Sequence, residues 1–393
     1  MNASTHSSLR SQIGPLLFLV GIFFLNFLSR IVLSPLMPAI ENDLRIGHDE
    51  AGSLFLLSSV GFCFGLIGSG FVSSRIQHRK TIVLSSVALG GLLLLVSVSR
   101  SLWGIRIGLI LLGIAAGLYL PSGVATVTEL VRPEHLGKAF AIHELAPNLA
   151  FVVAPFLAEA LLSRSSWRGV LVILGISAIV AGMVFALWGK GGISPSQTPD
   201  LRILRNILGE RSIWIMIGLF ALGTGAGFGV YSMLPIYLVS ERGMERAWAN
   251  TWLGLSRILS PGASFLAGWV TDRLGLKRTL TSIFVATSLT TMMLGIASDS
   301  WIIWVIFIQS VFAVCFFPAG FTALSRIGSP RAKNIVVSVT VPFSFLGLGV
   351  IPAGIGILGE MGLFPLGFVI LGGVCASGII LVRYLKFSTE QTQ

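Results

Sequence analysis

The stretch Gly268-Trp-Val-Thr-Asp-Arg-Leu-Gly-Leu-Lys-Arg278 joins two strongly apolar segments. A diverged copy, Gly70-Phe-Val-Ser-Ser-Arg-Ile-Gln-His-Arg-Lys80, lies 198 positions earlier and again joins apolar segments. The tripeptides Leu36-Met-Pro38 and Met233-Leu-Pro235 repeat at an offset of 197. This nearly constant offset indicates that the chain is two copies of one membrane unit, an arrangement typical of secondary transporters.

The composition predicts an integral membrane protein. Charged residues make up 11% of the chain and the mean hydropathy is +0.89, whereas soluble domains carry roughly 25% charged residues. A membrane-spanning helix needs about 20 mostly apolar residues. We expect twelve such helices, six in each half, over residues 13–37, 51–74, 81–99, 102–127, 139–162, 169–188, 213–239, 247–271, 280–297, 301–324, 335–358 and 364–384.

The distribution of basic residues predicts the orientation in the membrane. If both termini are cytoplasmic, 18 of the 27 Lys and Arg residues lie in cytoplasmic segments and seven lie outside. This is the excess of positive charge that cytoplasmic loops carry. The net charge of +11 therefore reports topology in the cytoplasmic membrane rather than nucleic-acid binding.

The region between the two halves is polar and rich in Gly, Pro and Ser. We expect an N-terminal half at 1–190, a flexible cytoplasmic linker at 191–210 and a C-terminal half at 211–393. Residues 201–208 have apolar side chains at helical spacing, which is typical of a helix on the membrane surface. The three cysteines fall inside predicted helices without a Cys-x-x-Cys pair, so we expect no metal site or disulfide there.

The repeated loop resembles the signature loop of the major facilitator superfamily, Gly-x-x-x-Asp-Arg-x-Gly-x-Lys/Arg-Arg/Lys. The matching residues are Gly268, Asp272, Arg273, Gly275, Lys277 and Arg278. The resemblance extends over nearly the whole chain through the twelve expected helices and the duplication. It implies a major facilitator fold in two pseudo-symmetric six-helix halves. It also implies a gating role for the signature loop, for Arg75 in its first-half copy and for Glu129 at the end of the expected fourth helix.

The first-half loop departs from the family pattern. Ser74 stands where the family has an acidic residue, and Gln77 replaces the second glycine. We therefore expect Asp272 to carry more of the gating role. An interfacial acid without a gating function is the alternative for Glu129. The two glycines of the exporter motif in the fifth helix are absent, since Leu145 and Ala154 occupy their places.

Two arginines lie near the middle of apolar spans. Arg30 belongs to the expected first helix and Arg257 to the eighth. Each costs about 2.5–3.5 kcal/mol in a membrane even on the lenient insertion scale. A guanidinium stays charged and offers paired donors that match a carboxylate or phosphate. We expect both to bind an anionic substrate, as the resemblance to monocarboxylate and oxalate carriers also implies; pairing with a structural acid or with helix carbonyls is the alternative.

His143 and Glu144 are an adjacent ionisable pair inside the expected fifth helix. Partial burial brings such groups toward titration near physiological pH, which makes them candidates for proton coupling. Neighbours in a helix point about 100° apart, so we expect only one to face a substrate path. A purely interfacial pair is the alternative. Pro147 stands where a zinc-protease motif needs its second histidine, and no phosphate-binding loop occurs.

Several further side chains are candidates for the substrate path. We expect Asn26, one helical turn before Arg30, to orient a bound anion. The other candidates to line the path are Tyr119, Tyr231, Trp252 and Gln309. Helix packing is the alternative role for each of them.

These observations together predict a secondary transporter rather than an enzyme. We expect it to move a small organic anion, a carboxylate, by alternating access with proton symport, as a monomer without cofactor, metal or nucleic acid. An exporter of amphipathic compounds, in which the arginines are structural, is the alternative. A membrane receptor on the same scaffold is a third class, which a long soluble domain would have favoured.

Overall fold

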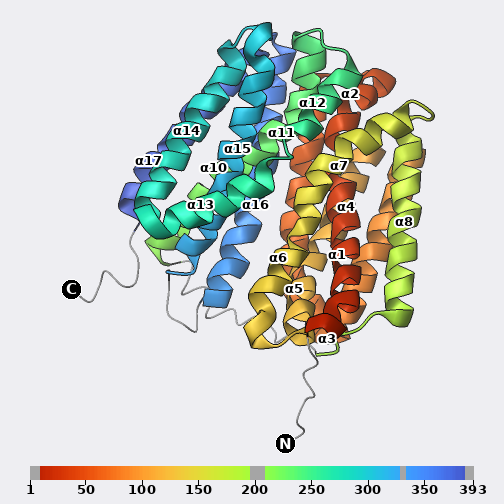
Figure 1. Cartoon of the computed structure of the whole chain (residues 1–393). Helices are drawn as coiled ribbons and strands as arrows, with labels where there is room; N and C mark the ends of the chain where they lie inside the picture. Colours follow the sequence, from red (N-terminus) through yellow and green to blue (C-terminus); the bar gives the residue numbers. More distant parts are fainter. Residues whose placement is uncertain (1–8, 195–208, 328–332, 386–393) are drawn as a thin grey trace, which may run out of the picture. The chain divides into compact units, whose positions relative to one another are not determined.

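The structure is a computed structural model, and it describes residues 9–194, 209–327 and 333–385 of the chain. Every regular element in these ranges is a helix (Figure 1). Ten of the helical stretches are long and apolar enough to cross a membrane. The expected all-helical membrane fold is thereby confirmed.

The chain folds into two compact units. The first contains residues 1–32 and 61–199 and the second contains residues 33–60 and 200–393. The helices of the first unit are α1 (Leu9–Ile31), residues 61–98 of α3 (His48–Val98), α4 (Leu102–Gly117), α5 (Tyr119–Leu130), η1 (Pro133–His135), α6 (Leu136–His143), α7 (Leu145–Leu162) and α8 (Trp167–Trp188). Within this unit α1 packs against α7, α8, α5 and α6.

The second unit joins a short piece of the N-terminal sequence to the whole C-terminal sequence. Its elements are α2 (Leu33–Leu44), residues 48–60 of α3, α10 (Arg211–Thr224), η2 (Gly225–Gly229), α11 (Val230–Ile236), η3 (Tyr237–Glu241), α12 (Arg246–Leu255), α13 (Ser260–Leu274), α14 (Leu276–Ile296), α15 (Asp299–Leu324), α16 (Lys333–Glu360) and α17 (Phe364–Tyr384). The apolar core of this unit is built around Phe220, Phe284 and Phe316, whose rings meet edge to face.

Prolines explain why several expected spans are broken rather than continuous. A proline ring clashes with the carbonyl four residues earlier and cannot donate to it, so a proline can kink or end a helix at that point. The breaks at Val32, Leu118, Glu144 and 256–259 each lie at or next to a carbonyl that a proline ring would meet. The pairs of proline and clashing carbonyl are Pro35 with Ile31, Pro121 with Gly117, Pro147 with His143, and Pro261 with Arg257.

The expected spans over residues 13–37, 102–127, 139–162 and 247–271 are therefore wrong as single helices, because each is divided into two helices at its break. Conversely, α3 covers two expected spans and bends at Gln77, whose backbone is not helical (φ 73°, ψ 157°). Each expected span thus overlaps one or more helices of the structure. The number of membrane crossings, twelve, stays a prediction.

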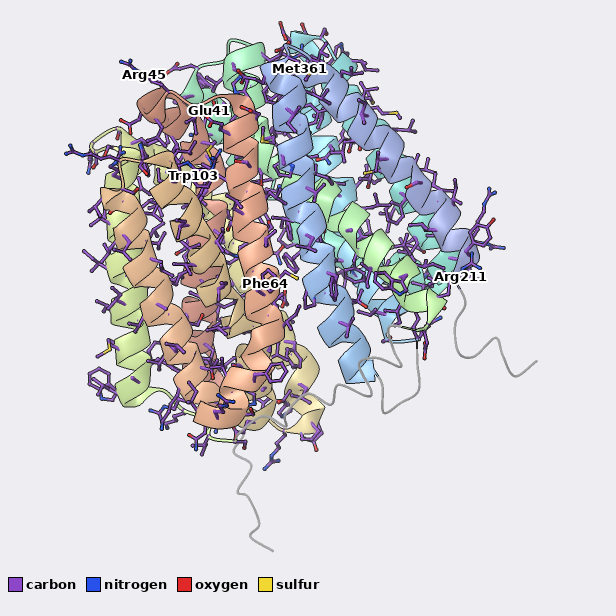
Figure 2. All side chains as sticks on the ribbon, turned by 180° about the vertical axis from the view of Figure 1, so that it is seen from behind. Glu41, Arg45, Phe64, Trp103, Arg211 and Met361 are labelled. Atoms are coloured by element: carbon purple, nitrogen blue, oxygen red, sulfur yellow. The ribbon has the colours of Figure 1, made fainter. Side chains whose placement is uncertain are left out.

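The surface of the molecule is rich in apolar side chains. Trp103 on α4 is 70% exposed and Met361, just after α16, is 66% exposed; both are labelled in Figure 2. Exposed side chains of this kind are expected where lipid replaces water around the helices. In the second unit, Glu41, Arg45 and Met361 lie at one end and Arg211 lies toward the other (Figure 2).

Candidate substrate site

Arg30 is the penultimate residue of α1, directly before the break that precedes Pro35. Its guanidinium carbon lies 3.7 Å from the centroid of the Phe62 ring and 5.4 Å from that of Phe27. No carboxylate in the described ranges lies within ion-pair distance of Arg30, and its Nε is buried without a hydrogen-bond partner there. Aromatic faces stabilise a cation by roughly 0.5–2 kcal/mol. The guanidinium is thus held by two aromatic rings, with no charge partner among the residues that the structure describes.

Arg257 lies in the turn between α12 and α13 and is 5% exposed. Its Nη2 donates to the Gly227 carbonyl over 2.9 Å, and its guanidinium carbon lies 5.0 Å from the centroid of the Tyr231 ring. One of its N–H donors is thus bonded to a helix carbonyl, as expected if this arginine is structural. Arg257 is nevertheless a cation buried at a broken helix. Transporters bind ions and substrates at such positions.

The two arginines share a local sequence beyond the charge itself. Arg30 lies in Leu28-Ser-Arg-Ile-Val-Leu-Ser-Pro35, and Arg257 lies in Leu255-Ser-Arg-Ile-Leu-Ser-Pro261. In each copy a helix ends close to the arginine and before the proline. The motif Ser-Arg-Ile followed by Ser-Pro therefore marks two broken helices, each with an arginine beside the break.

Gln309 and Tyr231 are both buried near Arg257. Gln309 on α15 donates through Nε2 to the Ala226 carbonyl over 2.9 Å, next to the carbonyl that Arg257 holds. Tyr231 is completely buried, with its ring beneath the guanidinium. Trp252 on α12 stacks on Trp248 and meets Phe307 edge to face. The structure therefore brings Tyr231 and Gln309 to the Arg257 site and places Trp252 in an aromatic cluster.

His143 is the completely buried member of the ionisable pair in the fifth expected span. Its ring stacks on Phe23, with centroids 4.5 Å apart, and its Nε2 lies 3.1 Å from the Tyr119 hydroxyl. That hydroxyl donates its one proton to the Leu19 carbonyl over 3.0 Å. The Tyr119 hydroxyl therefore links the buried imidazole to α1.

Glu144 differs from His143 in its surroundings. Its side chain is 59% exposed, and one carboxylate oxygen lies 3.9 Å from His143 Nδ1. That Nδ1 is buried and has no hydrogen-bond partner within the described residues. The break before Pro147 therefore places a buried imidazole next to an exposed carboxylate.

Asn26 makes helix-packing contacts within the first unit. It is 3% exposed, and its Nδ2 donates to the Ala116 carbonyl over 3.2 Å and lies 3.5 Å from Ser85 Oγ. Tyr119, through its bond to the Leu19 carbonyl, likewise ties α5 to α1. For these two residues the contacts observed are those of the packing alternative.

The signature loop forms the end of α13 and the start of α14. Gly275 has φ 83° and ψ 151°, and Gln77, its counterpart 198 positions earlier, has φ 73° and ψ 157°. The two loops therefore share one backbone conformation although only one has the glycine. Asp272, Arg278 and Arg75 are exposed, and the Arg273 guanidinium lies over the Trp269 ring at 4.0 Å.

Glu129 at the end of α5 binds the start of the expected linker. Its carboxylate accepts hydrogen bonds from the backbone N–H groups of Gly192, Ile193 and Ser194 and from the Ser194 hydroxyl. Gly191 and Gly192 have positive φ, which directs successive N–H groups toward one anion. The first residues of the linker are thus bound to the first unit; residues 195–208, including the expected surface helix, lie outside the described ranges.

No group of three or more His, Cys, Asp or Glu side chains suited to a metal ion occurs in the part of the chain that the structure describes. The three cysteines are free thiols, of which Cys63 and Cys375 are buried.

The chain belongs to the Major Facilitator Superfamily, whose family model matches residues 19–266 and 258–393. It is therefore a membrane transporter and not an enzyme, as its sequence predicts. It is similar to the cis,cis-muconate transport protein of Acinetobacter baylyi, with 23% identity over 408 residues that cover 96% of each chain.

Two further comparisons agree with this family. A shorter match to the 4-hydroxybenzoate transporter PcaK of Pseudomonas putida has 22% identity over 168 residues and covers 42% of this chain and 37% of that protein. The solved structure of the nucleoside transporter NupG aligns with a TM-score of 0.80 at 12% identity, covering 94% of this chain and 99% of the other. That structural likeness confirms the major facilitator fold.

Proposed function

We propose that this transporter moves a small organic carboxylate across the cytoplasmic membrane by alternating access, together with a proton. In this account Arg30 and Arg257 bind the anion and the His143–Glu144 pair carries the proton. The protein acts as a monomer with both termini and the linker in the cytoplasm.

The observation that carries the anion proposal is the state of Arg30. A guanidinium within an apolar helix is held by two aromatic rings, and no carboxylate of the described residues lies within ion-pair distance. A carboxylate offers two acceptors that match the guanidinium donors, so an anionic substrate would supply the missing partner. The relatives named for muconate and 4-hydroxybenzoate are named for carboxylates, which supports this class of substrate.

The proton proposal follows from charge balance and from the His143 site. Moving one unit charge through 100 mV exchanges about 2.3 kcal/mol, so an anion accumulates against a negative interior when its charge is compensated, and a cotransported proton supplies this compensation. His143 Nδ1 is buried, has no hydrogen-bond partner among the described residues and lies 3.9 Å from the exposed Glu144 carboxylate. A proton can therefore pass between an exposed acid and a buried base within one turn of the chain.

Export of amphipathic compounds is the second candidate, and the Arg257 contact favours it. A guanidinium that bonds the Gly227 carbonyl satisfies the expectation for a structural arginine. If Arg30 were structural as well, neither arginine would discriminate between an anion and a neutral or cationic compound.

Counterflow in proteoliposomes tests the proposal. We would compare cis,cis-muconate, 4-hydroxybenzoate and the lipophilic cation tetraphenylphosphonium. We expect exchange of at least one carboxylate and none of the cation. Hydrogen bonds to charged groups contribute about 1.5–3 kcal/mol, so Arg30→Ala should weaken carboxylate affinity roughly 10- to 150-fold. Arg164→Ala, at an exposed position after α7, is the matched control. Exchange of the cation but of neither carboxylate would establish the second candidate instead.

A further inference from the structure

The helical stretch from Arg211 to Ile236 is interrupted by a π turn, η2, at Gly225–Gly229. The Val230 N–H reaches the Gly225 carbonyl, five residues back. Two carbonyls of this turn accept bonds from side chains outside it, Ala226 from Gln309 and Gly227 from Arg257, each over 2.9 Å. π turns often occur at functional sites. Here one carbonyl of the π turn accepts a bond from Arg257, which we also place in the substrate site.

The helix that follows the π turn holds α2. Ser34 Oγ donates to the Tyr231 carbonyl over 2.7 Å and lies 3.3 Å from the Ser232 carbonyl. The Asn250 side chain donates to the Pro35 carbonyl over 3.3 Å. All of these groups are buried. The residues Gly227 and Tyr231 are one helical turn apart, so the carbonyl held by Arg257 and the carbonyl held by Ser34 belong to successive turns of one segment.

The first turns of α3 are held to α16 by close backbone contact. A Cβ on Gly52 would lie 2.5 Å from the Pro352 carbonyl oxygen, and one on Gly349 would lie 2.6 Å from the α-carbon of Leu56. Only glycine permits this approach. The His48 N–H donates to the Glu360 carboxylate over 2.8 Å. Within the second unit, the segment 33–60 is thus bound to α11, α12 and α16. These contacts lie on both sides of residues 45–47, and we call residues 45–47 the first-loop end.

We propose that Arg257 couples anion binding to the contact between α2 and α11. An anion that binds Arg257 competes with the Gly227 carbonyl for the guanidinium donors. Release of that carbonyl loosens the π turn, and the Tyr231 and Ser232 carbonyls move away from Ser34. The first-loop end, which we expect to face the outside, then separates from the C-terminal helices. This inference rests on the proposed function, because it requires an anion at Arg257.

Gln309 is a positioning residue in this scheme. It holds the Ala226 carbonyl, next to the one that Arg257 releases, and it also lies 3.4 Å from Thr291 Oγ1. Its amide is neutral, so it attracts an anion less strongly than the Arg257 guanidinium does. It therefore limits the movement to the part of the turn after Ala226.

The test uses Met37, which is completely buried on α2. In full-length protein with alanine in place of the three native cysteines, a Met37→Cys reporter is labelled with a membrane-impermeant maleimide. Calorimetry on the same protein measures binding of cis,cis-muconate and 4-hydroxybenzoate. We expect the bound carboxylate to raise the labelling rate about 2- to 10-fold, the effect of losing one hydrogen bond. Arg257→Ala should raise the rate without anion and abolish the response to it.

Two further variants separate this inference from the proposed function. Ser34→Ala should raise labelling without anion about 2- to 10-fold, whereas Ser53→Ala, whose hydroxyl bonds its own helix, should not. If a carboxylate binds but labelling stays constant, the coupling is overturned and the proposed function stands. Equal labelling in Ser34→Ala and Ser53→Ala would also overturn it. If neither carboxylate binds, the proposed function fails and the coupling with it.

Discussion

Replacing Gln77 with glycine should stabilise the protein. Gln77 lies at the bend of α3 with φ 73° and ψ 157°, a region of backbone space that is essentially restricted to glycine. Its counterpart in the second loop, Gly275, adopts nearly the same conformation without a side chain. The strain at Gln77 is therefore a consequence of the residue and not of the fold.

The magnitude follows from two opposing terms. A residue other than glycine in such a region costs about 1–3 kcal/mol. Glycine adds freedom to the unfolded chain, which costs about 0.4–1 kcal/mol. The backbone carbonyl of residue 77 accepts a hydrogen bond from Thr81 Oγ1, and the substitution keeps this bond. We therefore expect Gln77→Gly to raise the free energy of unfolding by about 0.5–2 kcal/mol.

Reversible unfolding by sodium dodecyl sulfate in mixed micelles measures the difference. Gln77→Ala separates backbone from side chain, because alanine retains the strain; we expect a change within about 0.5 kcal/mol. Gly275→Gln should lose about 1–3 kcal/mol, since it introduces the same strain at the second loop. Equal stabilisation by alanine and glycine at position 77, or a loss of stability with glycine, would refute the reasoning.

Three further predictions concern gating, coupling and the linker. Asp272→Asn should slow counterflow while changing substrate affinity less, because it biases conformations rather than contacts; an unchanged rate in a well-expressed variant would remove Asp272 from gating. Uptake by the wild type should rise with external acidity. Glu144→Gln should retain exchange but lose accumulation driven by a pH gradient. Full proton-driven uptake in this variant would count against the coupling role of Glu144. Glu129→Gln should speed tryptic cleavage at Lys190 about 3- to 10-fold, because the hydrogen bonds from residues 192–194 to the Glu129 carboxylate weaken. Glu134→Gln, which changes an exposed acid, is the control. Equal cleavage rates in the two variants would show that these bonds do not hold the linker.

The fold was largely predictable because membrane helices have a strong signature. Long apolar runs, the basic excess on one side and the duplicated loop are each set by the cost of placing polar groups in lipid. The breaks inside the spans were harder to predict from the sequence, although Pro35, Pro147 and Pro261 mark them. Other prolines, such as Pro155 and Pro318, lie inside continuous helices, so a proline alone does not predict where a helix ends.

The candidate site was predictable in its residue types but not in its contacts. Arg30 and Arg257 were evident from the cost of a charge in an apolar span. The sequence could not show that Arg30 rests on Phe62 while Arg257 bonds Gly227, because both contacts join segments about 30 residues apart. The burial of His143 rather than Glu144 likewise depends on how α6 and α7 meet at the break.

The central claim is that Arg30 and Arg257 each bind an anionic substrate, and direct binding tests it most plainly. Calorimetry would measure cis,cis-muconate and 4-hydroxybenzoate binding to the purified wild type, to Arg30→Ala with Arg257→Ala, and to the control Arg164→Ala. The account predicts that the double variant loses detectable binding of any carboxylate that the wild type and control bind. Undiminished binding in the double variant would contradict it.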